Sequence, residues 1–283
     1  MSRSTSEPGP GAAPGDGVWP AVAVGLGGLL VLFYAVPLAV LLVRAPGAVR
    51  VDGSVVGAAA TSVATAAAST ALATVVGVPL AYRLARAQFR GKRAVTGLVA
   101  LPLVLPPVVS GLLLLSAFGP AGLGGLVGVR TAGTHAGVVL AQTFVASPFV
   151  VVVGQAAFEG VDPRLEAAAR TLGRSRFDVF RRVALPLAAR GVLAGVTLAF
   201  ARAIGEFGAT LLLAYYPRTL PVAIWVAFQA RGVEAALPVG VVLLAVAAAA
   251  LGALGALGVL GRDTATPGPG PGPGPGTGAG PEP

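Results

Sequence analysis

Ionisable side chains are scarce inside the apolar runs of this chain, and one acid–base pair stands out. Arg202 and Glu206 are the only base and acid deep within a predicted membrane-spanning segment. A lone charge there is costly, so each needs a partner or water. Their i, i+4 spacing predicts that both lie on one face of a helix. Either they form an ion pair that only neutralises both charges, or this face borders a cavity or a subunit seam and Glu206 positions or gates a helix.

A second group of charges lies in one highly charged stretch, DPRLEAAARTLGRSRFDVFRRVALP, at residues 162–186. Asp162 followed by Pro163 is typical of a helix start, and Gly173 of a helix end. Ser175 with Asp178 predicts a capping box that begins a second short helix. We therefore expect two short amphipathic helices that present alanine, leucine and phenylalanine side chains within a ring of arginines. Such a surface either rests on anionic lipid or docks a soluble partner.

Other reactive side chains are missing. The chain has no cysteine and one histidine, His135, which excludes thiol chemistry and histidine clusters. The fragment Gly91-Lys92-Arg93 lacks the spacing and the hydroxyl of a phosphate-binding loop. We expect no catalytic residue, no metal site and no cofactor bound by this chain, which is therefore not predicted to be an enzyme by itself.

The composition predicts an all-α membrane protein. The sequence is 55% hydrophobic and 11% charged, with a mean hydropathy of +0.84, whereas soluble domains contain about 25% charged residues. Six continuous apolar segments are each long enough to cross a bilayer, which needs about 20 helical residues. They are residues 20–43, 56–82, 94–118, 136–157, 191–214 and 235–261.

The third segment contains a proline-rich stretch, LPLVLPPVVSG, at residues 101–111. Its prolines cannot all lie in an unbroken helix, because each removes a backbone donor. Non-helical backbone at membrane depth is tolerated only where it is buried in protein or lines water. Pro106, Pro107 and Gly111 are therefore either part of a simple kink or candidates for lining a pathway or gate, together with Arg202 and Glu206.

The distribution of basic residues predicts the orientation. Twelve lysines and arginines lie in the loops after the second and fourth segments, and five lie in the other three loops. Basic loops stay in the cytoplasm, so both of these loops and both termini are expected there, in a multi-pass protein of the cell membrane. The net charge of +9 is explained in this way without nucleic-acid binding. Residues 1–18 and the Pro/Gly-rich residues 262–283 are expected to be disordered tails around a membrane domain at 19–261.

The charged stretch resembles the signature loop of ATP-binding-cassette (ABC) importer permeases, and three further passages resemble the branch that carries oxyanions. These passages are LPLVLPPVVSG, ARAIGEFGA and AYYPRTLPVAIW. The general signature places glutamate where this chain has Ala167, whereas the oxyanion branch often has it one residue earlier, as Glu166 here. The residues expected to couple to an ATPase are Glu166, Ala168, Ala169, Leu172, Gly173, Phe177, Val183, Leu185 and Pro186.

This resemblance implies the type I importer permease (MetI-like) fold, with a core at about 56–261 and a coupling loop at 158–190. It implies import of an oxyanion, molybdate or tungstate, powered by two separate ATPase subunits that hold ATP and Mg²⁺. It further implies an extracytoplasmic binding protein and a second permease copy in a homodimer. The alternatives are a sulfate or thiosulfate permease of the same family and a gradient-driven secondary transporter.

Overall fold

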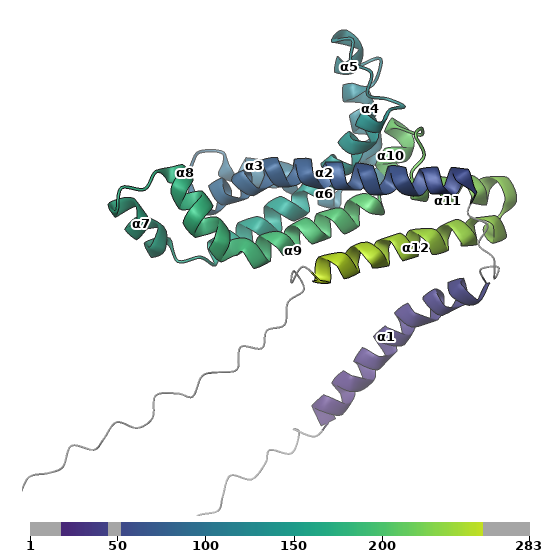
Figure 1. Cartoon of the computed structure of the whole chain (residues 1–283), viewed down its shortest axis with the longest axis horizontal. Helices are drawn as coiled ribbons and strands as arrows, with labels where there is room; N and C mark the ends of the chain where they lie inside the picture. Colours follow the sequence, from purple (N-terminus) through teal and green to yellow (C-terminus); the bar gives the residue numbers. More distant parts are fainter. Residues whose placement is uncertain (1–17, 45–51, 257–283) are drawn as a thin grey trace, which may run out of the picture. The chain divides into compact units, whose positions relative to one another are not determined.

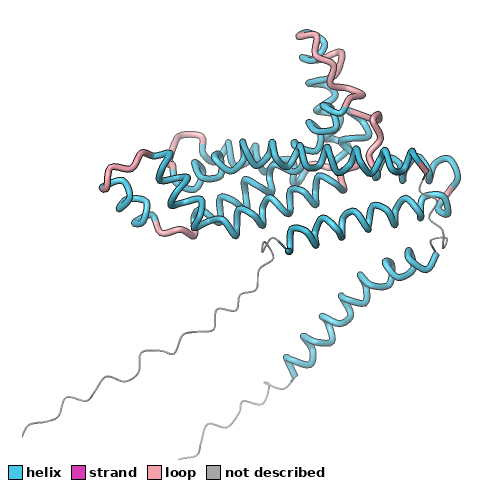
Figure 2. The backbone as a smooth tube through the Cα atoms, in the orientation of Figure 1, coloured by secondary structure: helices cyan, strands magenta, loops and turns pink. Residues whose placement is uncertain are grey.

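The computed structural model describes residues 18–44 and 52–256, and within them every regular element is a helix (Figures 1 and 2). Most of both predicted tails and the end of the sixth predicted segment lie outside the described residues. The elements are α1 (Val18–Arg44), α2 (Gly53–Arg86), α3 (Lys92–Val104), α4 (Pro107–Phe118), α5 (Leu123–Leu126), α6 (His135–Glu159), α7 (Pro163–Thr171), α8 (Arg176–Val179), η1 (Phe180–Ala184), α9 (Leu185–Ile204), α10 (Gly208–Leu213), α11 (Leu220–Arg231) and α12 (Val233–Ala256).

The described residues contain six stretches that are long and apolar enough to cross a membrane, as the sequence predicts. Two predicted segments are broken. The third is divided between α3 and α4 by Leu105 and Pro106, and the fifth ends at Ile204, after which α10 begins at Gly208. The fifth span also begins earlier than predicted, because the helical stretch runs from Arg176 to Ile204.

The chain divides into two compact units. The first comprises residues 1–66, 106–142 and 204–246. Its core includes Ala58 from α2, Leu220 from α11 and Val239 from α12, which pack together. The hydroxyl of Ser62 in α2 accepts a 2.7 Å hydrogen bond from the backbone N–H of Leu220, so the first turn of α11 is attached to α2.

The second unit comprises residues 67–105, 143–203 and 247–283. Here α6 packs against α2 and α9 through small residues, as is common where membrane helices approach closely. A Cβ atom on Gly77 of α2 would lie 3.1 Å from Val150 Cγ1, and one on Gly191 of α9 would lie 2.5 Å from Ala157 Cβ. This unit holds the charged stretch at residues 162–186.

The first turn of α2 is capped by Asp52, just before the span begins. Its carboxylate accepts hydrogen bonds from the hydroxyl and backbone N–H of Ser54 and from the N–H of Val55. These bonds, led by that of the Ser54 hydroxyl, hold the pKa of Asp52 below its usual value. The cap satisfies N–H groups that have no partner within the helix.

Candidate functional site

The helix α7 begins and ends where the sequence predicts. The Asp162 side chain accepts a 2.9 Å hydrogen bond from the backbone N–H of Arg164, and Pro163 occupies the first turn. The helix ends before Gly173, whose φ of +80° lies in the left-handed region that favours glycine. Local capping therefore fixes both ends of this short helix.

The expectation of a second separate short helix is wrong. Ser175 does cap a helix start by accepting a 3.1 Å hydrogen bond from Asp178 N–H, but this helix continues through η1 into the membrane span α9. Pro186 has no N–H to offer the carbonyl one turn earlier. The preceding turn widens to a π-helical turn, in which Leu185 N–H donates to Phe180 O. The leucine and proline of the signature therefore lie within one continuous helical stretch that connects the loop to the span.

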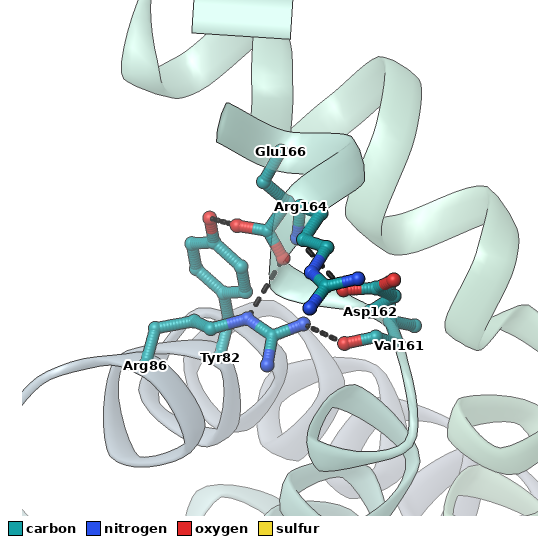
Figure 3. Close-up of polar contacts among 6 residues, drawn as sticks. All are labelled: Tyr82, Arg86, Val161, Asp162, Arg164 and Glu166. Atoms are coloured by element: carbon teal, nitrogen blue, oxygen red, sulfur yellow. Dashed lines mark hydrogen bonds and ion pairs between the residues drawn. The ribbon is translucent and has the colours of Figure 1, made fainter. Parts of the chain in front are cut away.

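The carboxylate of Glu166 forms the centre of a buried polar cluster (Figure 3). It accepts one 2.7 Å hydrogen bond from the Tyr82 hydroxyl and another from Arg86 Nε. Arg86 Nη2 also donates a 2.7 Å hydrogen bond to Val161 O, just before α7. We call Tyr82, Arg86 and Glu166 the clamp, because they attach the end of α2 to the first turn of α7.

The clamp fixes geometry more than it adds stability. Glu166 is 5% exposed, and the Arg86 side chain is 17% exposed. Removing both ions from water costs free energy that their attraction only partly repays. The bonds are directional, however, and a buried carboxylate left without them would be strongly unfavourable. The position of α7 relative to the end of α2 is therefore closely specified.

An aromatic cluster lies beside the clamp. The ring of Tyr82 lies 5.3 Å from that of Phe158 and 5.0 Å from that of Phe180, measured between centroids. Phe180 is half-buried and Ala184 is fully buried, so the exposed surface predicted from the sequence does not include every phenylalanine and alanine of this stretch. The ring of Phe180 packs against Tyr82 of α2 and Phe158 of α6, which attaches η1 to both helices.

The apolar side chains that remain exposed are on α7 and just after it. Leu165 is 49% exposed, Leu172 is 82% exposed and Phe177, on α8, is 66% exposed. Ala168 is also exposed, whereas Ala169, Val183 and Leu185 are partly buried and Pro186 is exposed. We call Leu165, Ala168 and Leu172 the apolar face of α7, because their i, i+3, i+7 spacing places them on one side of the helix.

The pathway candidates of the first unit meet where α4 contacts α10. Pro106 caps α4 and Pro107 is its first residue, so the predicted break in the third segment is confirmed. A Cβ on Gly111 would lie 2.9 Å from Ala209 Cα, and one on Gly208 would lie 2.9 Å from Pro107 Cβ. Two broken segments therefore cross with backbone almost touching backbone.

The expectation that Arg202 and Glu206 share one helix is wrong. Because α9 ends at Ile204, Arg202 lies in its last turn and Glu206 lies beyond it. The Glu206 carboxylate is 1% exposed and accepts a 2.7 Å hydrogen bond from the backbone N–H of Ala209, in the first turn of α10. The i, i+4 argument fails because it assumes a continuous helix.

Sequence reasoning misses two members of the clamp. By sequence alone, Arg86 is one of many basic residues in a loop predicted to be cytoplasmic, and nothing marks Tyr82. Both are about 80 positions from Glu166 along the chain, so no local spacing indicates their contact. The one signal in the sequence is a position that favours a negative charge. Glu166 lies among arginines and in the first turn of a predicted helix, where acidic side chains are stabilised.

The comparison with known families decides which group of proteins this is. The family described as binding-protein-dependent transport system inner membrane component matches residues 73–260. This chain belongs to that family. The match covers both broken segments, the clamp and the whole charged stretch.

Two relatives in this family are similar over most of their length. A probable molybdenum ABC transporter permease protein of Haloferax volcanii is 54% identical over 233 residues, which cover 81% of this chain and 87% of the relative. A molybdate/tungstate transport system permease protein of Thermococcus kodakarensis is 38% identical over 227 residues, which cover 78% of this chain and 88% of the relative.

Solved structures of ABC importers have the same fold. A bacterial alginate ABC transporter, in complex with its alginate-bound periplasmic protein, matches with a TM-score of 0.69 at 16% identity, over 85% of this chain and 94% of the other. An inward-facing methionine ABC transporter matches with a TM-score of 0.60 at 19% identity, over 72% and 94%. The expected importer permease fold is therefore confirmed.

Proposed function

We propose that this chain is the membrane-spanning permease subunit of an ABC importer that carries molybdate or tungstate into the cytoplasm. The observation that carries the proposal is its 54% identity, over most of both chains, to a protein described as a molybdenum ABC transporter permease. Further relatives are described as molybdate/tungstate or molybdenum transport permeases. None of these three is described as a sulfate or thiosulfate permease, so that alternative is not favoured.

The clamp and α7 support a role in receiving force from an ATPase. The proposed docking surface is the apolar face of α7, formed by Leu165, Ala168 and Leu172. Exposed apolar groups ringed by arginines are suited to a cleft in a soluble partner. Since α7 is attached to α2 and the helix from Arg176 continues into α9, movement of the loop would be transmitted to two spans. ATP and Mg²⁺ would be bound by the partner.

The contact between α4 and α10 is the proposed lining of the passage. Its buried hydroxyls Ser110 and Thr210 have no hydrogen-bond partner among the described residues. Hydroxyl groups can donate to an oxyanion without holding it as tightly as a positive charge would. A shift of α10 away from α4 would expose them, and Glu206 would position the start of α10.

The proposed transporter contains further subunits besides this chain. Two copies of this chain would form the pore, two ATPase subunits would dock on the cytoplasmic loops, and an extracytoplasmic binding protein would deliver the anion. Both termini would lie in the cytoplasm, since the basic loops after α2 and α6 would lie there. ATP-driven closure of the ATPases would then switch the pore between two states of access.

Reconstitution tests this function directly. The permease is coexpressed with the ATPase and binding protein of the same transporter and placed in liposomes, and uptake of labelled molybdate, tungstate and sulfate is measured with and without ATP. We expect uptake of molybdate and tungstate that requires ATP, the ATPase and the binding protein, with sulfate a poor competitor. Uptake by the permease alone, driven by an ion gradient, would refute the proposal.

A further inference from the structure

A cavity of about 670 Å³ lies between the end of α2 and the helices α7 and α8 in the second unit. Four arginines line it, namely Arg83, Arg86, Arg170 and Arg176, together with Glu166 as its one acid. Arg86 is occupied by Glu166 in the clamp (Figure 3). Within residues 18–44 and 52–256, the other three arginines make no ion pair. The cavity therefore concentrates positive charge that the described protein does not neutralise.

The cavity lies on the side of α7 away from the apolar face. The residues of α7 that line it are Pro163, Glu166 and Arg170, and each is two positions before a member of the apolar face. Two positions correspond to about 200° around an α-helix. A partner docked on Leu165 and Leu172 would therefore leave the charged side of α7 open to a different ligand.

The cavity also lies near the end of a membrane span. The helix α2 has 34 residues and ends at Arg86, whereas about 20 helical residues cross the hydrocarbon core. The end of α2 therefore extends into the headgroup layer under the proposed topology. The arginines share the cavity with the apolar side chains of Pro79, Phe177 and Phe180. The apolar side chains of the cavity would make no favourable contact with a small soluble anion. A phospholipid, by contrast, has both a phosphate for the arginines and apolar chains for these side chains.

We propose that this cavity binds the phosphate headgroup of an anionic phospholipid from the cytoplasmic leaflet. The proposal rests on the cytoplasmic placement of the loop under the proposed function. The phosphate would lie among Arg83, Arg170 and Arg176, and the start of the acyl chains would contact Phe177 and Phe180. Arginine suits this task because its planar donors match phosphate oxygens, and basic pockets at the cytoplasmic ends of membrane helices are suited to such headgroups.

Native mass spectrometry of the assembled permease–ATPase complex tests the site. Phosphatidylglycerol is titrated against phosphatidylcholine with the same acyl chains. A variant lacks the three arginines of the cavity, Arg83→Gln/Arg170→Gln/Arg176→Gln. A matched control removes the same charge from exposed positions that lie within seven residues of these arginines in the sequence, Arg90→Gln/Arg164→Gln/Arg174→Gln, none of which lines the cavity.

We expect the wild type and the control to retain phosphatidylglycerol. The cavity variant should bind it more weakly than the wild type by on the order of a hundredfold, since three cations near the phosphate are lost. Equal binding by both variants would overturn the proposal. Displacement of the lipid by millimolar inorganic phosphate or molybdate would also overturn it and indicate a site for soluble anions. Loss of the lipid when the ATPase docks would count against it too, because the partner would then cover the cavity.

Two measurements keep the outcomes separate. ATP-driven uptake is recorded on the same wild-type preparations. Normal uptake without bound phosphatidylglycerol would count against the lipid site alone, whereas bound phosphatidylglycerol without uptake would count against the importer function alone. If the triple variant does not assemble, Arg83→Gln is compared with Arg90→Gln, and the weaker lipid binding is again expected only in the first.

Discussion

Three side chains determine how the charged loop is attached to the membrane domain. Glu166 is nearly inaccessible, and its two partners, Tyr82 and Arg86, both belong to α2. An ion pair in such a place is sensitive to the loss of one member, because the other keeps its charge without compensation. Loss of both members is milder, since no buried charge remains.

This asymmetry gives a double-mutant prediction. Arg86→Gln leaves the Glu166 carboxylate with only the Tyr82 hydroxyl and should lower the free energy of unfolding by about 3 kcal/mol. Adding Glu166→Gln should restore part of that loss. Thermal unfolding of the purified complex measures both, and the control is Arg90→Gln, which changes an exposed arginine just after the end of α2. Strictly additive losses would contradict a paired clamp.

Gly173 makes a different kind of contribution, which comes from the backbone. Its φ is +80° and a Cβ there would meet nothing within 4 Å, so only conformation opposes substitution. Gly173→Val should destabilise the loop by about 1–2 kcal/mol, whereas Gly173→Asn should be better tolerated, because asparagine adopts this region more readily. We expect ATP hydrolysis without matching uptake in the valine variant. Equal uptake by both variants would indicate that the turn is unimportant.

Helices are predicted well wherever the signal is local. The six spans, the caps of α7 and the proline break before α4 follow from hydrophobicity, capping and the missing proline donor. The end of α9 at Ile204 and the joining of α8 to α9 do not follow, because tertiary packing decides whether a glycine-containing or proline-containing turn stays helical. Contacts between distant segments, such as Arg86 with Glu166, leave no pattern in a single sequence.

The contact of α4 with α10 should tolerate no added side-chain volume. Even the methyl group of Gly111→Ala would lie 2.9 Å from the backbone of Ala209, and such overpacking costs about 1–3 kcal/mol. We expect a lower unfolding temperature and impaired uptake. Gly97→Ala is the matched control, since a Cβ there meets nothing within 4 Å and alanine favours a helix by about 1 kcal/mol over glycine. An unchanged Gly111→Ala transporter would disprove close packing at this crossing.

The whole chain works as an importer only if its charged loops face the compartment that contains ATP. Two separate features agree on this orientation. Basic residues concentrate in the loops after α2 and α6, and the apolar face of α7, suited to a soluble partner, lies in the second of these loops. Under this proposed orientation, the loop after α5 would lie outside.

The absence of cysteine from all 283 residues makes this orientation measurable with single introduced thiols. Three neutral, exposed positions leave the charge balance unchanged, namely Phe89, Leu126 and Leu172, which are 42%, 83% and 82% exposed. A membrane-impermeant maleimide should label Leu126→Cys from outside intact cells, and Phe89→Cys and Leu172→Cys only in inverted vesicles. Labelling after solubilisation shows that each thiol is reactive.

The bound ATPase adds the decisive comparison. In inverted vesicles that carry the ATPase, Leu172→Cys should become protected, because its side chain would enter the partner's cleft, while Phe89→Cys, outside the apolar face of α7, should remain reactive. Stripping the ATPase should restore labelling of Leu172→Cys. Labelling of Leu172→Cys from outside the cell would show that the topology is the reverse of the one proposed. Labelling that the ATPase does not change would show that the apolar face of α7 is not the docking surface and would favour contact with lipid instead.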